Sequence, residues 1–374
     1  MRGRRTCWRW RSACAIGCAS GSGSSWSRRW RCGDAAPAFF GGEKRMKSIG
    51  SGGVGRGPLR VTVLAGGVGV EREVSLQSGA GVFEAMKRLG HRAALCDIGP
   101  DDLSALDEPA DFVFIALHGE FGEDGRLQRE LDRRGLPYCG SGAEASAAAF
   151  NKVKAKRGFA AAGVPTPAYV VATASSFEEV LTRMHPPCVV KPSASGSSVG
   201  TSIPKDRTSL AAAVRERIEA EGEALIEQYI RGPELTVGVL GETALPVCQI
   251  RTKREFYDYQ AKYIDDDTEY LFDVDLPGEL LAHVQRLSLA AHRALGCEVF
   301  SRVDWMIDRE SGSPFALEVN TIPGFTSHSL LPKAAARVGI TFDGLVQRIV
   351  DESLDRWEAR RCNASAESQR AVAV

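Results

Sequence analysis

From residue 59 onwards, apolar residues occur in two patterns: continuous runs and a helical period. Continuous apolar runs predict three buried strands, at 60–65, 94–98 and 111–117. Between the first two, the stretch 75–89 has the period of an amphipathic helix. Strands that alternate with a helix predict a βαβ arrangement and a parallel sheet, with functional loops at the carboxyl ends of its strands. Two such loops, 66–73 and 118–125, are therefore expected to line one cleft.

The region from 151 to 232 predicts further helices and strands. The expected helices are 152–162, 176–184 and 209–221, and the expected strands are 168–172, 188–192 and 224–230. Strands at 235–240 and 244–250 then predict a hairpin around Gly241. The polar stretch 251–270 has no apolar period. It is expected to be a lid or binding loop over a ligand, and a surface loop without a role is the alternative.

Residues 302–308 and 315–320 predict a second hairpin, joined by turn residues. Side chains alternate along a strand, so one face is expected to carry the polar residues Arg302, Asp304, Glu318 and Asn320. The opposite face is expected to point the apolar residues into a core: Val303, Trp305, Leu317 and Val319. The polar face offers the oxygen ligands that Mg²⁺ prefers, beside a positive charge for phosphate. A solvated face on an edge hairpin is the alternative.

A lysine and a loop of small residues form the second candidate for chemistry. Lys191 lies on the apolar strand 188–192, and the loop 193–200 that follows is rich in serine and glycine. Backbone N–H groups of such a loop can surround phosphate oxygens, and a lysine on an apolar strand needs an anionic partner. A flexible turn is the alternative. The glycine loop 66–69 lacks the G-x-G-x-x-G spacing and no P-loop motif occurs, so neither nucleotide fingerprint is supported.

Composition and charge limit the class of protein. The 374 residues are 44% hydrophobic and 25% charged, which predicts a globular protein of two or three domains, and no apolar stretch approaches the roughly eighteen residues of a membrane helix. The net charge of zero is unevenly distributed, because residues 1–60 contain 13 of the 47 basic but only 2 of the 47 acidic side chains. The rest of the chain is acidic, and neither a nucleic acid nor a membrane is expected as a partner.

Residues 1–58 differ from the rest, because Arg, Trp, Cys, Ser and Gly crowd together there without a persistent period. A disordered extension or a mis-assigned start codon is expected, with Met46 as a candidate start. The alternatives are a basic nucleic-acid arm and an organelle transit peptide. The six cysteines beyond this segment lack metal-ligand spacing, which predicts buried thiols in a reducing cytoplasm.

Short motifs distributed over residues 59–357 occur in a specific order. They are Leu64-Ala65-Gly66-Gly67, Glu71-Arg72-Glu73-Val74-Ser75, Ala116-Leu117-His118-Gly119, Gly122-Glu123-Asp124-Gly125, Val190-Lys191-Pro192, Gly196-Ser197-Ser198-Val199-Gly200, Tyr257-Asp258-Tyr259, Ala261-Lys262-Tyr263, Arg302-Val303-Asp304, Glu318-Val319-Asn320-Thr321 and Pro323-Gly324-Phe325-Thr326-Ser327-His328-Ser329-Leu330. In this order they strongly resemble the D-alanine–D-alanine ligase family of the ATP-grasp superfamily. Together they are far more specific than any one of them.

The resemblance implies a fold and a division into domains. The fold class is α/β, or α+β in the ATP-grasp part, with a parallel-sheet domain before two ATP-grasp subdomains. After the extension 1–58, the expected segments are an N-terminal substrate-binding domain at 59–150, a central subdomain with the phosphate loop and adenine strand at 151–232, a C-terminal subdomain with the lid and metal site at 233–360, and a tail at 361–374.

The resemblance also implies a reaction, in which ATP and one D-alanine form a D-alanyl phosphate that the amine of a second D-alanine attacks. The products would be ADP, phosphate and D-alanyl-D-alanine, a precursor for peptidoglycan. The ATP site would comprise Lys152, Lys191, Ser197, Ser198, Glu227, Gln228, Tyr229, Ile230, Glu234 and Lys262. Two Mg²⁺ or Mn²⁺ ions would be bound by Asp304, Glu318 and Asn320.

Further roles follow from the same resemblance. Glu71 would pair with the ammonium of the first D-alanine, with Ser197 and Tyr263 connected to it by hydrogen bonds, and Arg302 would stabilise the acyl phosphate and the tetrahedral oxyanion. The residues implied to bind substrate are Glu71, His118, Lys262, Gly324, Ser329 and Leu330, and those implied to be catalytic are Glu71, Ser197, Tyr263, Arg302 and Ser329. Two neighbours depart from the family pattern, Ser195 and Gln260, which affects loop detail rather than reaction class.

There are three alternatives to a D-alanine–D-alanine ligase. Another ATP-grasp carboxylate–amine ligase is disfavoured by Glu71, Tyr263 and Ser329, and a D-alanine–D-lactate ligase by Tyr263, where those relatives have Phe. A nucleotide-binding module without catalysis would have no need of the intact hairpin face. Phosphate release that depends on D-alanine separates these readings. The resemblance further implies a homodimer in a bacterial cytoplasm, with the first domain as its interface.

Overall fold

The structure, a computed structural model, describes residues 56–252, 268–326 and 328–372. Its first sheet is parallel, with β1 (Arg60–Gly66) between β2 (Arg92–Ile98) and β3 (Phe112–Ile115), as the apolar runs predict. Helix α1 (Arg72–Arg88) connects β1 to β2, and the short η1 (Ser104–Leu106) precedes β3. Helix α1 begins three residues before the predicted start, and the hydroxyl of Ser75, inside the helix, donates to the carbonyl of Ala116 at 2.8 Å.

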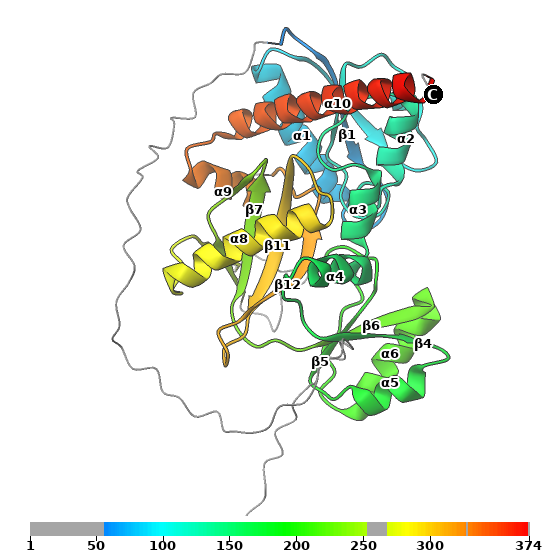
Figure 1. The fold of residues 1–374 in the computed structure, drawn as a ribbon, viewed down its shortest axis with the longest axis vertical. Helices are drawn as coiled ribbons and strands as arrows, with labels where there is room; N and C mark the ends of the chain where they lie inside the picture. The colour runs from blue at the N-terminus through cyan, green and yellow to red at the C-terminus, as the bar shows by residue number, and fades with distance from the viewer. Residues whose placement is uncertain (1–55, 253–267, 327, 373–374) are drawn as a thin grey trace, which may run out of the picture. The chain divides into compact units, whose positions relative to one another are not determined.

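The core of this first sheet includes residues from the far end of the chain. Helices α2 (Arg126–Arg134), α9 (Leu330–Arg337) and α10 (Phe342–Val372) contribute apolar side chains to it. Figure 1 shows α10 beside α1, and Phe325 packs edge-on against Phe114, Phe300 and Phe342. The segment that follows the second hairpin is thereby held against the loops of the first sheet.

The second sheet has six strands, all antiparallel, in the order β10-β9-β7-β11-β12, with β8 on β7. Its strands are β7 (Glu234–Leu240), β8 (Thr243–Ala244), β9 (Cys248–Arg251), β10 (Glu269–Leu271), β11 (Phe300–Ile307) and β12 (Pro314–Asn320). Helices α8 (Gly278–Ala294), α3 (Ala143–Phe150) and α4 (Lys152–Ala161) supply its core. The strand predicted at 244–250 is wrong as one element, since Pro246 has no N–H to donate and separates β8 from β9.

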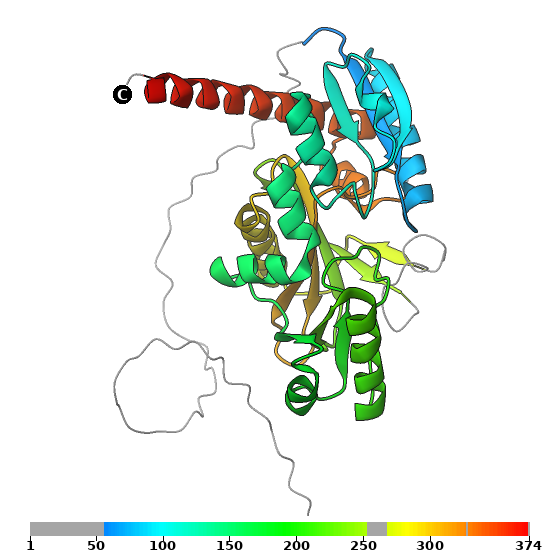
Figure 2. The same ribbon diagram turned by 90° about the vertical axis from the view of Figure 1, so that its right-hand side faces the viewer.

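A third, three-stranded sheet has the order β4-β6-β5 and lies at the opposite end of the six-stranded sheet from the first sheet (Figure 1). It consists of β4 (Tyr169–Thr173), β6 (Glu223–Gln228) and β5 (Cys188–Lys191) and packs against α5 (Phe177–Arg183) and α6 (Arg207–Glu221). Figure 2 shows α6 lying alongside these strands. The third sheet therefore places the end of β5 and of β6 opposite the second hairpin.

The hairpin of β11 and β12 has the predicted register around its polar residues. Asp304 pairs with Glu318 and Arg302 with Asn320. A β-bulge between Asp304 and Trp305 then sets Trp305 opposite Ala316, which leaves Leu317 as the extra residue. The expectation that Leu317 points into the core is therefore wrong: Leu317 lines a cavity of about 630 Å³, while Val303, Trp305 and Val319 are in the core.

Four other expectations have mixed outcomes. The predicted lid lies mostly at 253–267, outside the described residues. The six described cysteines are free, but only Cys139, Cys188, Cys248 and Cys297 are buried, whereas Cys96 is half-buried and Cys362 is exposed. Among the described helices, none is long and apolar enough to cross a membrane. The division at 59–150, 151–232 and 233–360 stays a prediction, since α4, α9 and α10 each pack across one of these limits.

Candidate functional site

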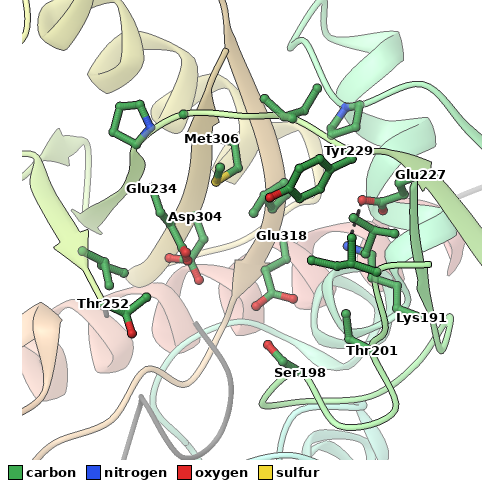
Figure 3. A pocket seen from close by; sticks show the side chains of 18 of the residues that line it. Lys191, Ser198, Thr201, Glu227, Tyr229, Glu234, Thr252, Asp304, Met306 and Glu318 are labelled. Carbon is green, nitrogen blue, oxygen red and sulfur yellow. Dashed lines mark ion pairs between the residues drawn. The ribbon is translucent and has the colours of Figure 1, made fainter. Parts of the chain in front are cut away.

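A large cavity, of about 630 Å³, lies between the three-stranded and six-stranded sheets. Figure 3 shows Lys191, Glu227 and Tyr229 on one side, Glu234, Asp304 and Met306 on the other, and Glu318 between them. The residues predicted for ATP that line this cavity are Lys152, Lys191, Ser198, Glu227, Gln228, Tyr229, Ile230 and Glu234. Its mixture of apolar walls and a few convergent charged groups is typical of a cofactor or nucleotide site.

A second cavity of about 40 Å³ adjoins the first. It is lined by Glu71 and Glu123 from the first sheet's loops, by Ser197, and by Arg302 and Asn320 of the hairpin. Lys152, Ser195 and Glu318 line both cavities. The predicted cleft between loops 66–73 and 118–125 is therefore confirmed, and it shares three lining residues with the larger cavity.

Glu227 lines the large cavity and pairs with two lysines. Its Oε2 lies 2.9 Å from Nζ of Lys191, and its Oε1 lies 3.0 Å from Nζ of Lys156. Burial by itself would raise the pKa of Glu227, but the two lysine charges outweigh burial and lower it. The carboxylate is therefore ionised and holds Lys191 at the cavity wall.

The loop after β5 is held in an unfavourable backbone conformation. Ser197 and Ser198 have φ values of 50° and 57°, in the left-handed region, where such residues cost on the order of 1 kcal/mol each. Lys152 donates from Nζ to the carbonyl of Ser195 at 2.5 Å and lies 3.5 Å from Glu318. Burial lowers the pKa of Lys152 and Glu318 opposes this shift. An anion in the cavity would therefore favour the charged form of this lysine.

Glu71 lies at the start of α1, and its carboxylate accepts a hydrogen bond from the hydroxyl of Ser197. Two glycines allow this approach, since a Cβ at Gly119 or Gly196 would overlap with Oε2 of Glu71. A buried carboxylate next to a small cavity is suited to bind a ligand ammonium group.

Asp304 is buried and is bound from two sides. Arg302 donates to it from Nε at 2.9 Å and from Nη2 at 2.7 Å, and the Thr236 hydroxyl donates to Oδ1 at 2.6 Å. Within the described residues no three His, Cys, Asp or Glu side chains cluster as metal ligands, so the candidate cation site consists of two carboxylates and the Asn320 amide. Such an all-oxygen set fits a hard divalent cation.

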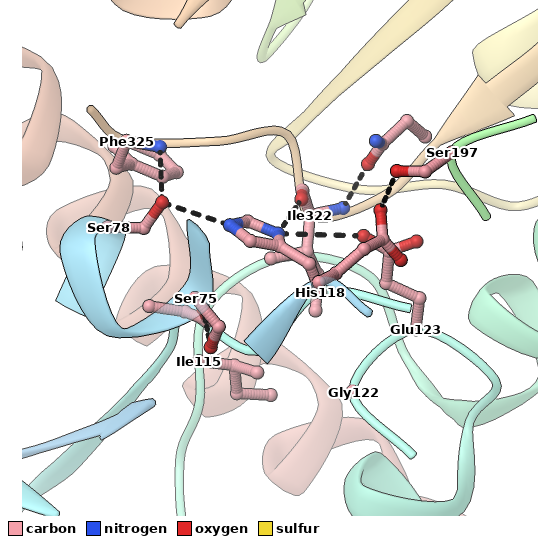
Figure 4. Close-up of polar contacts among 12 residues, drawn as sticks. Ser75, Ser78, Ile115, His118, Gly122, Glu123, Ser197, Ile322 and Phe325 are labelled. Carbon is pink, nitrogen blue, oxygen red and sulfur yellow. Dashed lines mark hydrogen bonds and ion pairs between the residues drawn. The ribbon is translucent and has the colours of Figure 1, made fainter. Parts of the chain in front are cut away.

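Figure 4 shows a buried polar network around His118. The Nε2 of His118 lies 2.9 Å from the Ser78 hydroxyl, and its Nδ1 lies 3.0 Å from the Ile322 carbonyl and 3.7 Å from Glu123. Ser78 also accepts from the backbone N–H of Phe325. The network thus joins the first sheet to the segment after β12.

Burial raises the pKa of Glu123 from 4.5 to about 7; His118 opposes the shift and the charge of Glu71 adds to it. Because the folded pKa is raised, the stabilisation from this group is fully present below pH 4.5 and is lost as pH rises through 7. Relative to Glu123→Gln, the unfolding free energy of the native chain is expected to fall by about 3 kcal/mol over that range. Urea unfolding at a series of pH values measures this.

The exposed Glu120→Gln is the control for the Glu123 experiment, since Glu120 is only three residues away. Its stability curve serves as the reference for the loss of one exposed carboxylate from the same loop. Parallel curves for Glu123→Gln and the native chain would contradict the raised pKa.

Of the residues predicted to bind substrate, Gly324, Ser329 and Leu330 lie at or just before the start of α9. A Cβ at Gly324 would lie 2.6 Å from the hydroxyl of Ser329 and 3.9 Å from that of Ser78. Ser329 accepts from the backbone N–H of Thr326 at 2.9 Å. Leu330 is buried in a small apolar cluster with Cys248 and Ile250. Lys262 and Tyr263 lie outside the described residues.

The sequence by itself predicts no role for three polar residues that are buried near the two cavities: Ser78, Lys156 and Thr236. For Lys156 a signal existed, since it lies three residues after Val153 and three before Phe159, on the apolar side of its helix. Thr236 lacks such a signal, because a threonine in an apolar strand is common.

Comparison with known proteins agrees with this geometry. The family described as D-ala D-ala ligase C-terminus matches residues 159–351, and that described as D-ala D-ala ligase N-terminus matches residues 100–141. A D-alanine–D-alanine ligase of Gloeobacter violaceus is 46% identical over 303 residues, which cover 79% of this chain and 100% of that protein.

Two solved structures are similar in fold. One is a D-alanine–D-alanine ligase from Bacillus anthracis complexed with ATP, with a TM-score of 0.70 and 32% identity, covering 81% of this chain and 99% of that one. The other is a D-Ala:D-Ser ligase from Enterococcus faecalis, with a TM-score of 0.71 and 27% identity, covering 79% and 100%. On this sequence identity and coverage, the chain belongs to the D-alanine–D-alanine ligase family of the ATP-grasp fold, and it is an ATP-dependent ligase that joins D-alanine to D-alanine for peptidoglycan precursors.

Proposed function

We propose that the ligation proceeds through a D-alanyl phosphate formed where the two cavities meet. The observation that carries this proposal is that Lys152, Ser195 and Glu318 line both the large and the small cavity. One end of a nucleotide in the large cavity would then lie next to an amino acid bound in the small cavity. The carboxylate oxygen of D-alanine attacks the γ-phosphorus and releases ADP, and the amine of the second D-alanine then attacks the acyl carbon and releases phosphate.

The proposed nucleotide contacts divide between the two ends of the large cavity. Lys152 and Lys191 attract the phosphates, and backbone N–H groups at Ser197 and Ser198 surround them. Glu234 and the segment 227–230 bind ribose and adenine, with backbone contacts from Gln228, Tyr229 and Ile230. The ATP complex of the Bacillus anthracis relative supports the use of ATP in this cavity.

Two Mg²⁺ or Mn²⁺ ions are proposed to be held by Asp304, Glu318 and Asn320. The fit rests on their oxygen atoms, which are the donors that hard cations prefer. When bound, the ions neutralise charge on the phosphates. Thr236 and Arg302 hold Asp304 in one orientation before any ion arrives.

Thr236→Val is expected to weaken Mn²⁺ binding in the presence of ADP by about 10–100-fold, because Oδ1 of Asp304 loses the hydroxyl that orients it. Electron paramagnetic resonance of free Mn²⁺ during a titration measures the affinity without turnover. Thr236→Ser keeps the hydroxyl and serves as the control. Equal Mn²⁺ affinity in the two variants would show that the Thr236 bond has no part in metal binding.

In the small cavity, Glu71 is proposed to bind the ammonium of the first D-alanine, and the hydroxyl of Ser197 holds the Glu71 carboxylate in place. Arg302 lines the same cavity and is proposed to place its positive charge beside the acyl phosphate and the developing oxyanion. The second D-alanine is proposed to bind near His118, Gly324 and Ser329, with Leu330 beside them. Tyr263 and Lys262 complete the proposed set from outside the described residues.

The test is phosphate release from MgATP by purified protein offered D-alanine, L-alanine, or D-alanine with D-lactate or D-serine. We expect release with D-alanine alone and D-alanyl-D-alanine in the product. A mixed product that dominates in the presence of D-lactate or D-serine would replace the dipeptide assignment. Binding of MgATP without any release on D-alanine would overturn the proposed chemistry.

A cytoplasmic location and a homodimer are further proposals. Free thiols at all six described cysteines support a reducing compartment. The acidic charge balance after residue 60 is unfavourable for nucleic acid as a partner. The homodimer rests on family resemblance, and light scattering after gel filtration tests it.

A further inference from the structure

Lys156 is a fully buried lysine outside the set of residues that line either cavity. Its Nζ donates to the Thr166 hydroxyl at 2.7 Å, lies 3.0 Å from Oε1 of Glu227, and lies 5.5 Å from the centre of the Tyr169 ring. A lysine is almost never fully buried unless it is paired, since removal of its charge from water is costly. Packing alone therefore does not explain why a lysine occupies this position.

The partner of Lys156 is shared with a lysine of the nucleotide cavity. Glu227 is 1% exposed and binds Lys156 through Oε1 and Lys191 through Oε2. Burial lowers the pKa of Lys156 to about 8 and Glu227 opposes the shift, with Lys191 and Lys152 as the other charges nearby. The three side chains thus form a row in which the carboxylate lies between two ammonium groups.

Two consecutive hydrogen bonds hold Lys156, at the buried end of this row, in place. The Thr166 hydroxyl that accepts from Lys156 donates to the carbonyl of Ala316 at 2.8 Å. Ala316 is on β12, two residues before Glu318. Lys156 therefore connects the strand that carries Glu227 to the hairpin that carries the candidate metal ligands.

We propose that Lys156 is a positioning residue for ATP, which holds Glu227 so that this carboxylate in turn sets the location of Lys191. With Lys156 in place, one oxygen of Glu227 keeps its cation when the Lys191 ammonium turns toward a phosphate. Without it, Glu227 depends on Lys191 alone and competes with ATP for that ammonium group. The inference rests on the proposed role of Lys191 at the phosphates.

Lys156→Met is expected to raise the Kd of MgATP by about tenfold, measured by calorimetry without D-alanine so that no turnover occurs. In a Glu227→Gln background, the same substitution should change the Kd less than twofold, because the carboxylate through which Lys156 acts is gone. A tenfold loss that persists in that background, or an unchanged Kd in the single variant, would overturn the proposal.

Thr166→Val tests the same point with both charges retained. It removes the hydroxyl that fixes Nζ of Lys156, whereas Thr166→Ser retains it. A raised Kd in Thr166→Val but not in Thr166→Ser supports the proposal, and equal values in the two contradict it. If Lys156→Met does not fold, the comparison of Thr166→Val with Thr166→Ser tests the proposal in its place.

Lys191→Met separates the inference from the proposed function on which it rests. A Kd unchanged by Lys191→Met would overturn the phosphate assignment and the role of Lys156 with it. A Kd raised by Lys191→Met but not by Lys156→Met would overturn the role of Lys156 alone.

Discussion

Arg302→Lys is expected to lower kcat for D-alanyl-D-alanine formation by about 10²–10³-fold. Arg302 lines the small cavity and donates to Asp304 with two nitrogens, so its planar fork is fixed in orientation. A lysine keeps the charge but offers a single nitrogen on a flexible stem and cannot reproduce the fork. Steady-state kinetics with saturating MgATP and D-alanine measure the effect.

The control for this experiment is Arg348→Lys on α10, where the guanidinium pairs with Glu352 outside both cavities. Its kcat is expected to equal that of the native chain. Because Arg302 also donates to Asp304, calorimetry of MgATP binding to Arg302→Lys separates a loss of nucleotide affinity from the loss of kcat. A kcat for Arg302→Lys within threefold of native would remove Arg302 from the proposed chemistry.

Trp305→Ala is expected to lower the free energy of unfolding by about 3–5 kcal/mol. Trp305 is fully buried in the core of the six-stranded sheet, and its indole N–H donates to the Ser288 hydroxyl of α8 at 2.9 Å. The substitution leaves a cavity beneath the hairpin and removes the hydrogen bond that the Ser288 hydroxyl accepts from the indole. Because Trp305 follows Asp304 directly, the loss also loosens the strand that carries the proposed metal ligand.

Urea unfolding followed by circular dichroism suits this test, because four of the six tryptophans lie within residues 1–32 and would dilute a fluorescence signal. Trp305→Phe keeps most of the apolar volume and loses the N–H, so its loss of stability should be smaller than that of the alanine variant. A Trp305→Ala protein within 1 kcal/mol of the native chain would mean that the core closes around the gap.

The polar face of the second hairpin was predictable because it depends only on local rules. A strand period of two puts Arg302 with Asp304 and Glu318 with Asn320, and the turn residues between the strands set their antiparallel return. The parallel first sheet followed in the same way, since each apolar run reports burial of its own strand.

The same local rules failed at Leu317. The bulge between Asp304 and Trp305 shifts the register by one residue, and a one-residue shift turns the side chain to the opposite face. Alternation of apolar residues is identical with or without a bulge. Only the packing of the two strands reveals that Leu317 lines the large cavity.

The sequence by itself determined the family, the order of the strands that carry Lys191 and Asp304, and the residue types at the site, because these are encoded by short motifs and by periodicity. Tertiary structure decided which distant side chains share a partner, such as Lys156 and Lys191 on Glu227, or His118 between Ser78 and Ile322. Those contacts join residues that belong to different elements of the fold. Their energies come from burial and from a low local dielectric, and neither quantity exists until the chain has folded.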